Sequence, residues 1–353
     1  MILLDGAKTN PFPLSKEAEE LSQLIKDNNL SLVDRLEYFE DITNIEIGDT
    51  NLNRARSYER KFDFRQFLIK FEGNNPTGTQ KDRIAFAQVH DAIRRGFDVI
   101  SVATCGNYGA SIAFAAYLGG LRCNIFIPES FQTSRIKDME QFGAKIIRYP
   151  GSYEETVWES SNIARVSDWY DANPGGANTP LQIRAYAQIA EEIYDVLRDA
   201  PKMVAVPVSN GTLLAGIHRG FVGLYKRGKT SRIPKLIAGS STNKNPIIHS
   251  YQKGLTTCED LDPKKIIETE WNEPLINSHS FDGEEALYAL HESKGEAFDI
   301  SDAKMLAQAQ FLSKEEGLKV LPASTAGLAA LLDLHEKQPL EPDRYVAIIT
   351  AKR

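Results

Sequence analysis

The stretch Phe71-Glu-Gly-Asn-Asn-Pro-Thr-Gly-Thr-Gln-Lys81-Asp-Arg83 joins two patterned segments of the chain. Residues 67–71 before it form an apolar run that predicts a strand, and the apolar spacing after it predicts a helix that begins near Asp82. Lys81 is therefore expected near the positive end of a helix dipole, which disfavours protonation of its amine. Schiff-base chemistry requires a neutral amine, although on position alone a surface lysine at a helix start is the simpler interpretation.

The nine residues N-P-T-G-T-Q-K-D-R at positions 75–83 resemble the cofactor-lysine signature of the fold-type II enzymes that use pyridoxal 5'-phosphate (PLP), above all the threonine synthases. A match of this length is far more specific than a short glycine motif. The resemblance extends from about Gly48 to Thr350. It implies that PLP is the cofactor and that Lys81 is both its Schiff-base residue and the catalytic base.

A second motif, Thr104-Cys-Gly-Asn107-Tyr108-Gly-Ala-Ser111, follows a predicted strand and opens a predicted helix. Such a turn exposes backbone N–H groups that suit a carboxylate, although an ordinary helix cap has the same pattern. It resembles the family turn that holds the substrate carboxylate, and Asn107 matches the residue set against the phenolic oxygen of the cofactor. The resemblance thus assigns substrate binding to Thr104, Cys105, Gly106, Asn107 and Tyr108.

A third strand–turn–helix junction, Val206-Pro-Val-Ser209-Asn-Gly-Thr-Leu213, is similar to the phosphate-binding loop of the family, but poorer in glycine. Backbone N–H groups at a helix start can bind phosphate, and the alternative is a plain connection between strand and helix. The resemblance assigns cofactor binding to Ser209, Asn210, Gly211, Thr212 and Leu213.

The last predicted strand ends at Thr350, where the family places a hydroxyl facing the pyridine nitrogen of PLP. A hydroxyl partner leaves that nitrogen unprotonated, which favours elimination and replacement over transamination. Residues 315–324, E-E-G-L-K-V-L-P-A-S, resemble a further family segment, with Leu321 where a Glu is common.

The substrate is less well determined than the cofactor. Threonine synthases commonly carry N-P-x-R-x-x-G-Q in the region of residues 171–184, where Asn and Arg reach the phosphate of O-phosphohomoserine. Asn173 matches, the following Arg is absent, and Arg184 could supply the charge or simply face solvent. The leading hypothesis is a lyase that converts O-phosphohomoserine and water to threonine and phosphate. The alternative is β-replacement or β-elimination on a serine- or cysteine-type amino acid, and a non-catalytic PLP-binding protein is disfavoured by the intact Lys81.

Alternation of short β-branched runs with amphipathic segments predicts an α/β fold of two lobes, each with a mainly parallel twisted sheet flanked by helices. We expect one sheet from residues 81–176, another from the flanking segments, and a ligand cleft between the lobes. The predicted domains are a large cofactor-binding domain, residues 1–80 plus 190–353, and a smaller mobile domain, residues 81–189. Closure of the mobile domain on substrate would exclude water.

The amino-acid composition argues against several other classes of protein. A net charge of −7 argues against a nucleic-acid partner, because phosphate binding needs a positive surface. Three cysteines without paired spacing indicate a reducing compartment, and six scattered histidines show no metal-ligand spacing. No signal peptide and no membrane span is apparent, so we expect a cytoplasmic enzyme, with a homodimer as the expected assembly.

Overall fold

The computed structural model describes residues 3–4, 8–9, 12–27, 29–104 and 106–353. The chain divides into two compact units. The first unit is Met1–Gly48 with Asn75–Leu181, and the second unit is Asp49–Asn74 with Gln182–Arg353.

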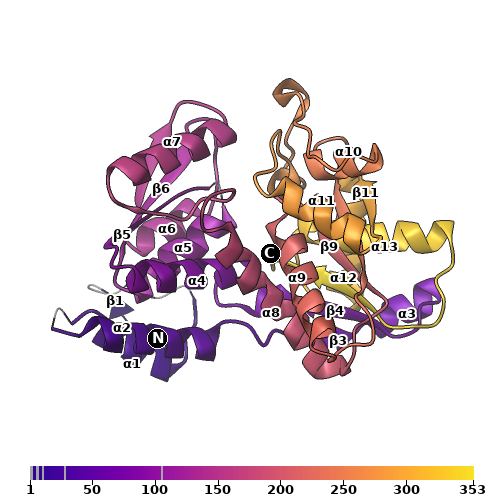
Figure 1. Cartoon of the computed structure of the whole chain (residues 1–353), viewed down its shortest axis with the longest axis horizontal. Helices are drawn as coiled ribbons and strands as arrows, with labels where there is room; N and C mark the ends of the chain where they lie inside the picture. Colours follow the sequence, from indigo (N-terminus) through magenta and orange to yellow (C-terminus); the bar gives the residue numbers. More distant parts are fainter. Residues whose placement is uncertain (1–2, 5–7, 10–11, 28, 105) are drawn as a thin grey trace. The chain divides into compact units, whose positions relative to one another are not determined.

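The first unit contains a parallel sheet with the strand order β7-β6-β5-β8. Figure 1 labels two of these strands, β5 and β6, beside α5, α6 and α7. Helix α7 packs on β5, β6 and β8, whereas α5 packs on β5 and β6 and also against α4. Helix α7 begins with a capping box between Ser152 and Glu155, which satisfies donors at both ends of the first turn. The elements of the first unit are β1 (Leu3–Leu4), β2 (Lys8–Thr9), α1 (Lys16–Ile25), α2 (Leu32–Glu46), α4 (Lys81–Arg94), β5 (Val99–Ala103), α5 (Asn107–Leu118), β6 (Arg122–Pro128), α6 (Ile136–Gln141), β7 (Lys145–Tyr149), α7 (Tyr153–Val166) and β8 (Tyr170–Asp171).

The second unit contains a sheet with the order β11-β10-β9-β12-β4-β3, parallel except for the pairing of β3 with β4. Helix α13 packs on β9, β10, β11 and β12, and its apolar side chains join the core of this unit. The elements are β3 (Leu52–Arg54), α3 (Arg56–Phe62), β4 (Phe67–Phe71), η1 (Glu72–Asn74), α8 (Thr179–Leu197, which begins in the first unit), β9 (Met203–Pro207), α9 (Thr212–Lys226), β10 (Lys235–Ser241), α10 (Pro246–Gln252), η2 (Pro263–Lys265), η3 (Glu273–Leu275), α11 (Gly283–Glu292), β11 (Glu296–Ile300), α12 (Asp302–Glu315), η4 (Pro322–Thr325), α13 (Ala326–Lys337) and β12 (Tyr345–Ile349).

The predicted fold class is confirmed: two mainly parallel sheets flanked by helices, one within residues 81–176 and one from the flanking segments. The units differ from the predicted domains at the N-terminus, because residues 1–48 belong with the smaller sheet. The physical reason is aromatic packing: Phe12 contacts Phe114 at 5.3 Å between ring centroids, and Phe39 stacks on Phe86 at 5.6 Å.

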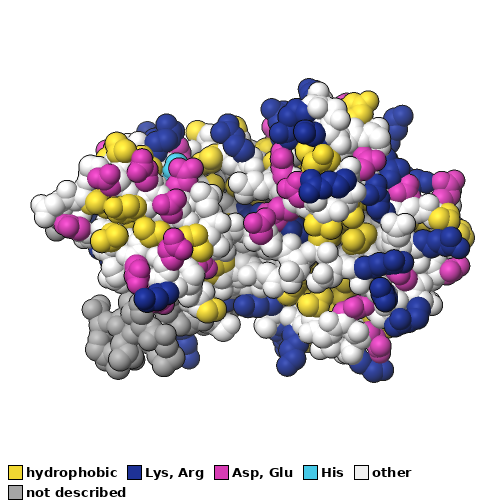
Figure 2. Space-filling model, turned by 90° about the horizontal axis from the view of Figure 1, so that it is seen from below, with side chains coloured by type: hydrophobic (Ala, Val, Ile, Leu, Met, Phe, Trp, Pro, Cys, Tyr) yellow, Lys and Arg dark blue, Asp and Glu magenta, His cyan; other side chains and the backbone are white. Residues whose placement is uncertain are grey.

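The surface carries charges of both signs. Figure 2 shows Lys and Arg side chains interspersed with Asp and Glu side chains on the face drawn, so neither sign covers it. Among the described residues, no group of His, Cys, Asp and Glu side chains could hold a metal ion. The described helices include none that is long and apolar enough to cross a membrane.

His218 is a buried titratable residue in the middle of α9. Its side chain is 6% exposed, and its Nε2 atom has no hydrogen-bond partner. Burial lowers the pKa of His218, with Arg219 acting in the same direction and Glu292 against it. His218 therefore binds a proton less readily in the folded protein than in the unfolded chain, where histidine has its ordinary pKa of about 6.5.

We expect this histidine to make the protein less stable in acid. As the pH falls through about 6.5, the unfolded state gains a proton that the folded state does not, so the free energy of unfolding decreases until the lower folded-state pKa is reached. His218→Leu should flatten this part of the stability profile, measured by urea unfolding between pH 7.5 and 5, whereas the half-buried His249 offers a His249→Leu control. Parallel profiles for wild type and His218→Leu would contradict the assignment.

Candidate active site

The turn before α4 places Lys81 as the first residue of that helix. Gly78 has a φ of +84°, a left-handed conformation that favours glycine, and its N–H donates to the Asn75 carbonyl at 2.8 Å. The Lys81 side chain is half-buried, and its Nζ atom lies 5.5 Å from the centroid of the Tyr108 ring. The predicted strand–turn–helix junction is therefore present, with Lys81 half-buried at the start of the helix.

Asp82, directly after Lys81, fixes the shape of this turn. Its side chain is fully buried and accepts two hydrogen bonds from Thr77, from the backbone N–H at 2.8 Å and from Oγ1 at 2.6 Å. The Thr77 hydroxyl also lies 3.0 Å from the Ser111 hydroxyl, which donates to the Asn107 carbonyl. One buried network thus joins the Lys81 turn to the start of α5, where Asn107 lies.

Burial raises the pKa of Asp82 to about 6, while hydrogen bonds from Ser111 and Thr77 and the charge of Arg135 oppose the shift. The two oxygens of Asp82 accept the hydrogen bonds from Thr77. Because the pKa of Asp82 is higher in the folded protein, the unfolded chain ionises first, so stabilisation by this group is lost as the pH rises from 3.8 to about 6.

Asp82→Asn is expected to destabilise the first unit. The amide has one acceptor oxygen where the carboxylate has two, and no charge, so the Thr77 donors lose hydrogen bonds to a charged group, each of which contributes about 1.5–3 kcal/mol. Thermal unfolding should show a clear fall in the midpoint, whereas the exposed Asp168, already in a left-handed conformation that Asn tolerates, provides Asp168→Asn as a neutral control. Equal midpoints for the two variants would show that the network does not hold the turn.

The turn after β5 leads directly into α5, with Asn107 as the first helical residue and no side chain capping the helix. Tyr108 is anchored: its hydroxyl donates to the Ala172 carbonyl at 2.8 Å and accepts from the Gln88 amide. The structure thus brings Lys81, Asn107 and Tyr108 together within the first unit. Cys105 lies outside the described residues, and Thr104 and Gly106 flank it at the end of β5.

The two residues predicted to reach a substrate phosphate differ in their surroundings. Asn173 is 2% exposed, and its Oδ1 accepts from the Ala103 N–H at 2.7 Å while its Nδ2 donates to Ser160, Ser161 and Asp171. Its amide is therefore used to hold the fold. Arg184 is exposed on α8. Asn173 lies in the first unit and Arg184 in the second unit.

The predicted phosphate loop connects β9 to α9 in the second unit. Gly211 has a φ of +99°, and an added Cβ would meet the Asp282 carbonyl oxygen at 2.8 Å and the Ala286 Cβ at 2.7 Å. No side chain caps the first turn of α9, so its N–H groups are not occupied by a capping residue. The side chains of Asn210 and Thr212 are engaged elsewhere, by Asn277 and Asp282 respectively.

Thr350 follows β12, which is the neighbour of β9 in the parallel sheet, so Thr350 and the 209–213 loop lie at the same edge. The Thr350 hydroxyl is 3.1 Å from the Ser324 hydroxyl, which also accepts from the Ala351 N–H. The similarity of residues 315–324 to a family segment therefore corresponds to a contact with the predicted ring-nitrogen residue.

Sequence reasoning missed the residues that hold the others in place. They are Thr77, Asp82, Gln88, Ser111 and Ser324. Thr77 and Asp82 lie inside the quoted motif, so attention to their polarity at buried positions could have found them. Gln88 contacts Tyr108 from a helix whose apolar stripe gave no sign of a buried amide.

Comparison with known proteins shows the family of this chain. The family model for pyridoxal-phosphate-dependent enzymes matches residues 43–351. A threonine synthase of Methanocaldococcus jannaschii is 28% identical over 305 residues, which cover 86% of this chain and 74% of that protein. Among solved structures, maize serine racemase has a TM-score of 0.72 at 17% identity, with 90% of this chain and 92% of that chain covered.

The processed form of threonine deaminase isoform 2 from Solanum lycopersicum also has a TM-score of 0.72, at 15% identity, with 100% of this chain and 96% of that chain covered. At such identities the two solved structures show the fold alone. The family model covers most of the chain and includes the Lys81 turn. This chain belongs to the fold-type II family of pyridoxal-phosphate-dependent enzymes, and pyridoxal phosphate is its cofactor.

Proposed function

We propose that this enzyme is a carbon–oxygen lyase of amino-acid biosynthesis that converts O-phosphohomoserine and water to threonine and phosphate. The observation that carries the proposal is the 28% identity to a threonine synthase over 86% of the chain. The Lys81 turn supports it, because it presents a half-buried amine beside the turn that is predicted to bind the substrate carboxylate.

The residues present fit the cofactor. Gly211 has no room for a side chain, and the uncapped start of α9 offers backbone N–H groups of the kind that bind a phosphate. In this proposal Ser209, Asn210, Gly211, Thr212 and Leu213 hold the phosphate through the main chain, since the side chains of Asn210 and Thr212 have other partners. Lys81 would hold the cofactor covalently.

Pyridoxal phosphate, when bound, supplies an electron-withdrawing ring that stabilises negative charge at the substrate α-carbon. Lys81 would remove the α-proton as a neutral amine. The N–H groups of the 104–108 turn would bind the substrate carboxylate, and Asn107 would face the ring oxygen. Thr350 would orient the ring nitrogen through its hydroxyl without protonating it, since a hydroxyl does not give up its proton at neutral pH.

A second candidate function is β-elimination or β-replacement on a serine- or cysteine-type amino acid. The structure favours keeping it for a specific reason: the Asn173 amide is committed to protein partners, and Arg184 is exposed. Both residues were predicted to recognise the phosphate that distinguishes phosphohomoserine from the substrates of the alternative.

A substrate panel with an arginine variant tests the proposal. We expect phosphate release and threonine formation from O-phosphohomoserine, and little turnover of serine, threonine, phosphoserine or acetylserine. If Arg184 binds the γ-phosphate, Arg184→Ala should weaken the binding of phosphohomoserine by about 1.5–3 kcal/mol and leave the binding of unphosphorylated substrates unchanged. Arg219→Ala, at an exposed position on α9, is the matched control.

Absence of threonine formation, together with keto-acid release from serine or threonine, would replace the leading function by the alternative. An equal response of all substrates to Arg184→Ala would remove Arg184 from the site. The homodimer, the cytoplasmic location and closure of a mobile domain stay predictions of the sequence.

A further inference from the structure

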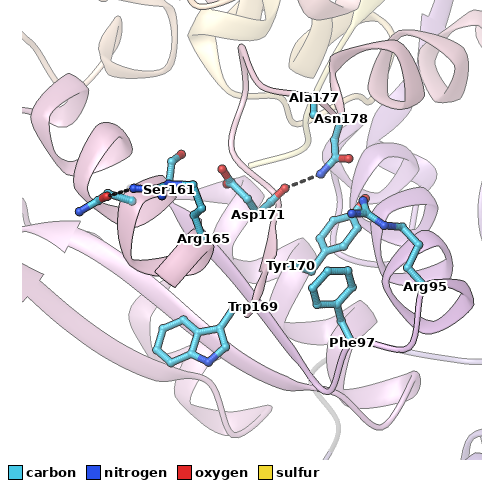
Figure 3. A pocket seen from close by; sticks show the side chains of 10 residues that line it. Arg95, Phe97, Ser161, Arg165, Trp169, Tyr170, Asp171, Ala177 and Asn178 are labelled. Atoms are coloured by element: carbon cyan, nitrogen blue, oxygen red, sulfur yellow. Dashed lines mark hydrogen bonds between the residues drawn. The ribbon is translucent and has the colours of Figure 1, made fainter. Parts of the chain in front are cut away.

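The first unit contains a pocket of about 500 Å³ (Figure 3). Arg95, at the C-terminal end of α4, lines this pocket, whereas Lys81 is the first residue of that helix. Aromatic side chains form part of its wall, and two arginines and one aspartate contribute charge. The lining residues are Arg95, Phe97, Ser161, Asn162, Arg165, Trp169, Tyr170, Asp171, Ala177 and Asn178. Figure 3 shows Asp171 between Arg165 and Ser161 on one side and Arg95 with Tyr170 and Phe97 on the other.

The polar walls of this pocket are held in place by the unit itself. The Arg95 guanidinium lies 5.0 Å from the Phe97 ring centroid and 5.4 Å from that of Tyr170, and it pairs with Asp91 at 3.5 Å. The Asn178 amide donates to the Asp171 carbonyl. A pocket with pre-positioned groups loses little conformational entropy when a ligand binds.

Two charges in the wall remain available to a ligand. Arg165 is held by a neutral partner, since its Nη2 donates to the Asn162 Oδ1 at 2.8 Å, and none of the described carboxylates forms an ion pair with it. Asp171 accepts both hydrogen bonds from Asn173 on Oδ1, at 3.0 and 2.7 Å, which leaves Oδ2 as an acceptor. A cation and an anion in one aromatic-walled pocket match the two charges of a zwitterion.

We propose that this pocket is a second binding site, for a free α-amino acid with an aromatic or large apolar side chain. The ligand carboxylate pairs with Arg165, its ammonium group with Asp171, and its side chain lies against Phe97 and Trp169. The volume accommodates such a ligand, because small-molecule sites begin at roughly 300 Å³.

The segment 170–173, which is β8 and the two residues after it, connects the pocket to the Tyr108 anchor within the first unit. Tyr170 and Asp171 line the pocket, the Ala172 carbonyl holds the Tyr108 hydroxyl, and the Asn173 amide holds the Ala103 N–H at the end of β5. A ligand that pulls on Asp171 therefore acts on the residues that anchor Tyr108 and the 104–108 turn. The pocket is thus an effector site, and this regulatory part rests on the proposed function.

Binding is tested separately from catalysis. Reduction of the holoenzyme with borohydride fixes the cofactor to its lysine and blocks amino-acid exchange at that site. Calorimetric titration of the reduced protein with L-phenylalanine should still show binding. Phenethylamine, which lacks the carboxylate, and 3-phenylpropionate, which lacks the ammonium group, should each bind roughly tenfold more weakly or worse, as expected for the loss of one charge-assisted contact.

Variants locate the site. Arg165→Gln should lower the affinity for L-phenylalanine roughly tenfold or more, and Asp171→Asn should lower it to the same extent. Arg122→Gln, at an exposed position in β6, should leave this affinity unchanged. In unreduced enzyme, phenylalanine should change the rate of the reaction in wild type and Arg122→Gln but not in Arg165→Gln, whose basal rate stays unchanged.

Several results would overturn the proposal. One is no heat of binding on the reduced protein at roughly 10 mM ligand, a concentration that would detect even millimolar affinity. Another is equal affinity of all three variants. Binding that survives reduction without any effect on the rate would keep the site and remove the regulation. If no substrate is turned over, the proposed function fails while the binding result stands.

Discussion

Lys81→Ala is expected to abolish turnover while leaving the protein folded. The variant lacks the amine that would hold the cofactor and move the α-proton, and positioned acid–base groups alone contribute roughly 10²- to 10⁴-fold. Because Lys81 is half-buried at a helix start, alanine fits there without strain. The measurement is the turnover number on the best substrate of the panel, with circular dichroism as the check on folding.

Two controls sharpen this experiment. Lys137→Ala, at an exposed position on α6, should retain full activity. A small primary amine added to Lys81→Ala should restore part of the rate, because it can take over the proton transfer that the variant lost. A Lys81→Ala enzyme that keeps a substantial share of wild-type turnover would remove Lys81 from the mechanism.

Gly211→Ala is expected to lower both cofactor affinity and stability. The φ of +99° is unfavourable for alanine, and the new Cβ would lie 2.8 Å from a backbone oxygen that cannot move without shifting the start of α11. The strain should cost about 1–3 kcal/mol before any effect on the phosphate is counted. The loop would relieve it by moving the N–H groups that the phosphate needs.

The same helix provides the matched control. Gly223 lies inside α9 with no atom within 4 Å of an added Cβ. Gly223→Ala should therefore stabilise the protein slightly, by about 0.5–1 kcal/mol, because alanine is the better helix former. Thermal midpoints of the apo and PLP-loaded proteins measure both effects. Cofactor affinity that is unchanged in Gly211→Ala would mean that this loop does not bind the phosphate.

The sequence was most informative where a local pattern determines the structure. The strand predicted at residues 67–71 and the helix predicted to begin near Asp82 are observed at Phe67–Phe71 and Lys81–Arg94, since an apolar run and a periodic apolar spacing each specify their own conformation. The Lys81 turn was predictable for the same reason.

Contacts between distant segments could not be predicted in this way. The packing of Phe39 on Phe86 places residues 1–48 with the first unit, and only the folded chain shows it. Asn173 is another example: its match to a family motif indicated a ligand contact, but the Ala103 N–H, seventy residues earlier, is what its Oδ1 meets. Side-chain partners of this kind depend on the tertiary fold and leave no periodic signal.

The most direct test of the account is the location of the cofactor. The holoenzyme is reduced with borohydride, digested, and its peptides are mapped by mass spectrometry for the pyridoxyl group. We predict a single modified lysine, Lys81. The buried Lys70 is the informative comparison, because it is 1% exposed on β4 and paired with Glu192. A label on Lys70, or on any lysine other than Lys81, would contradict the assignment on which the proposed function rests.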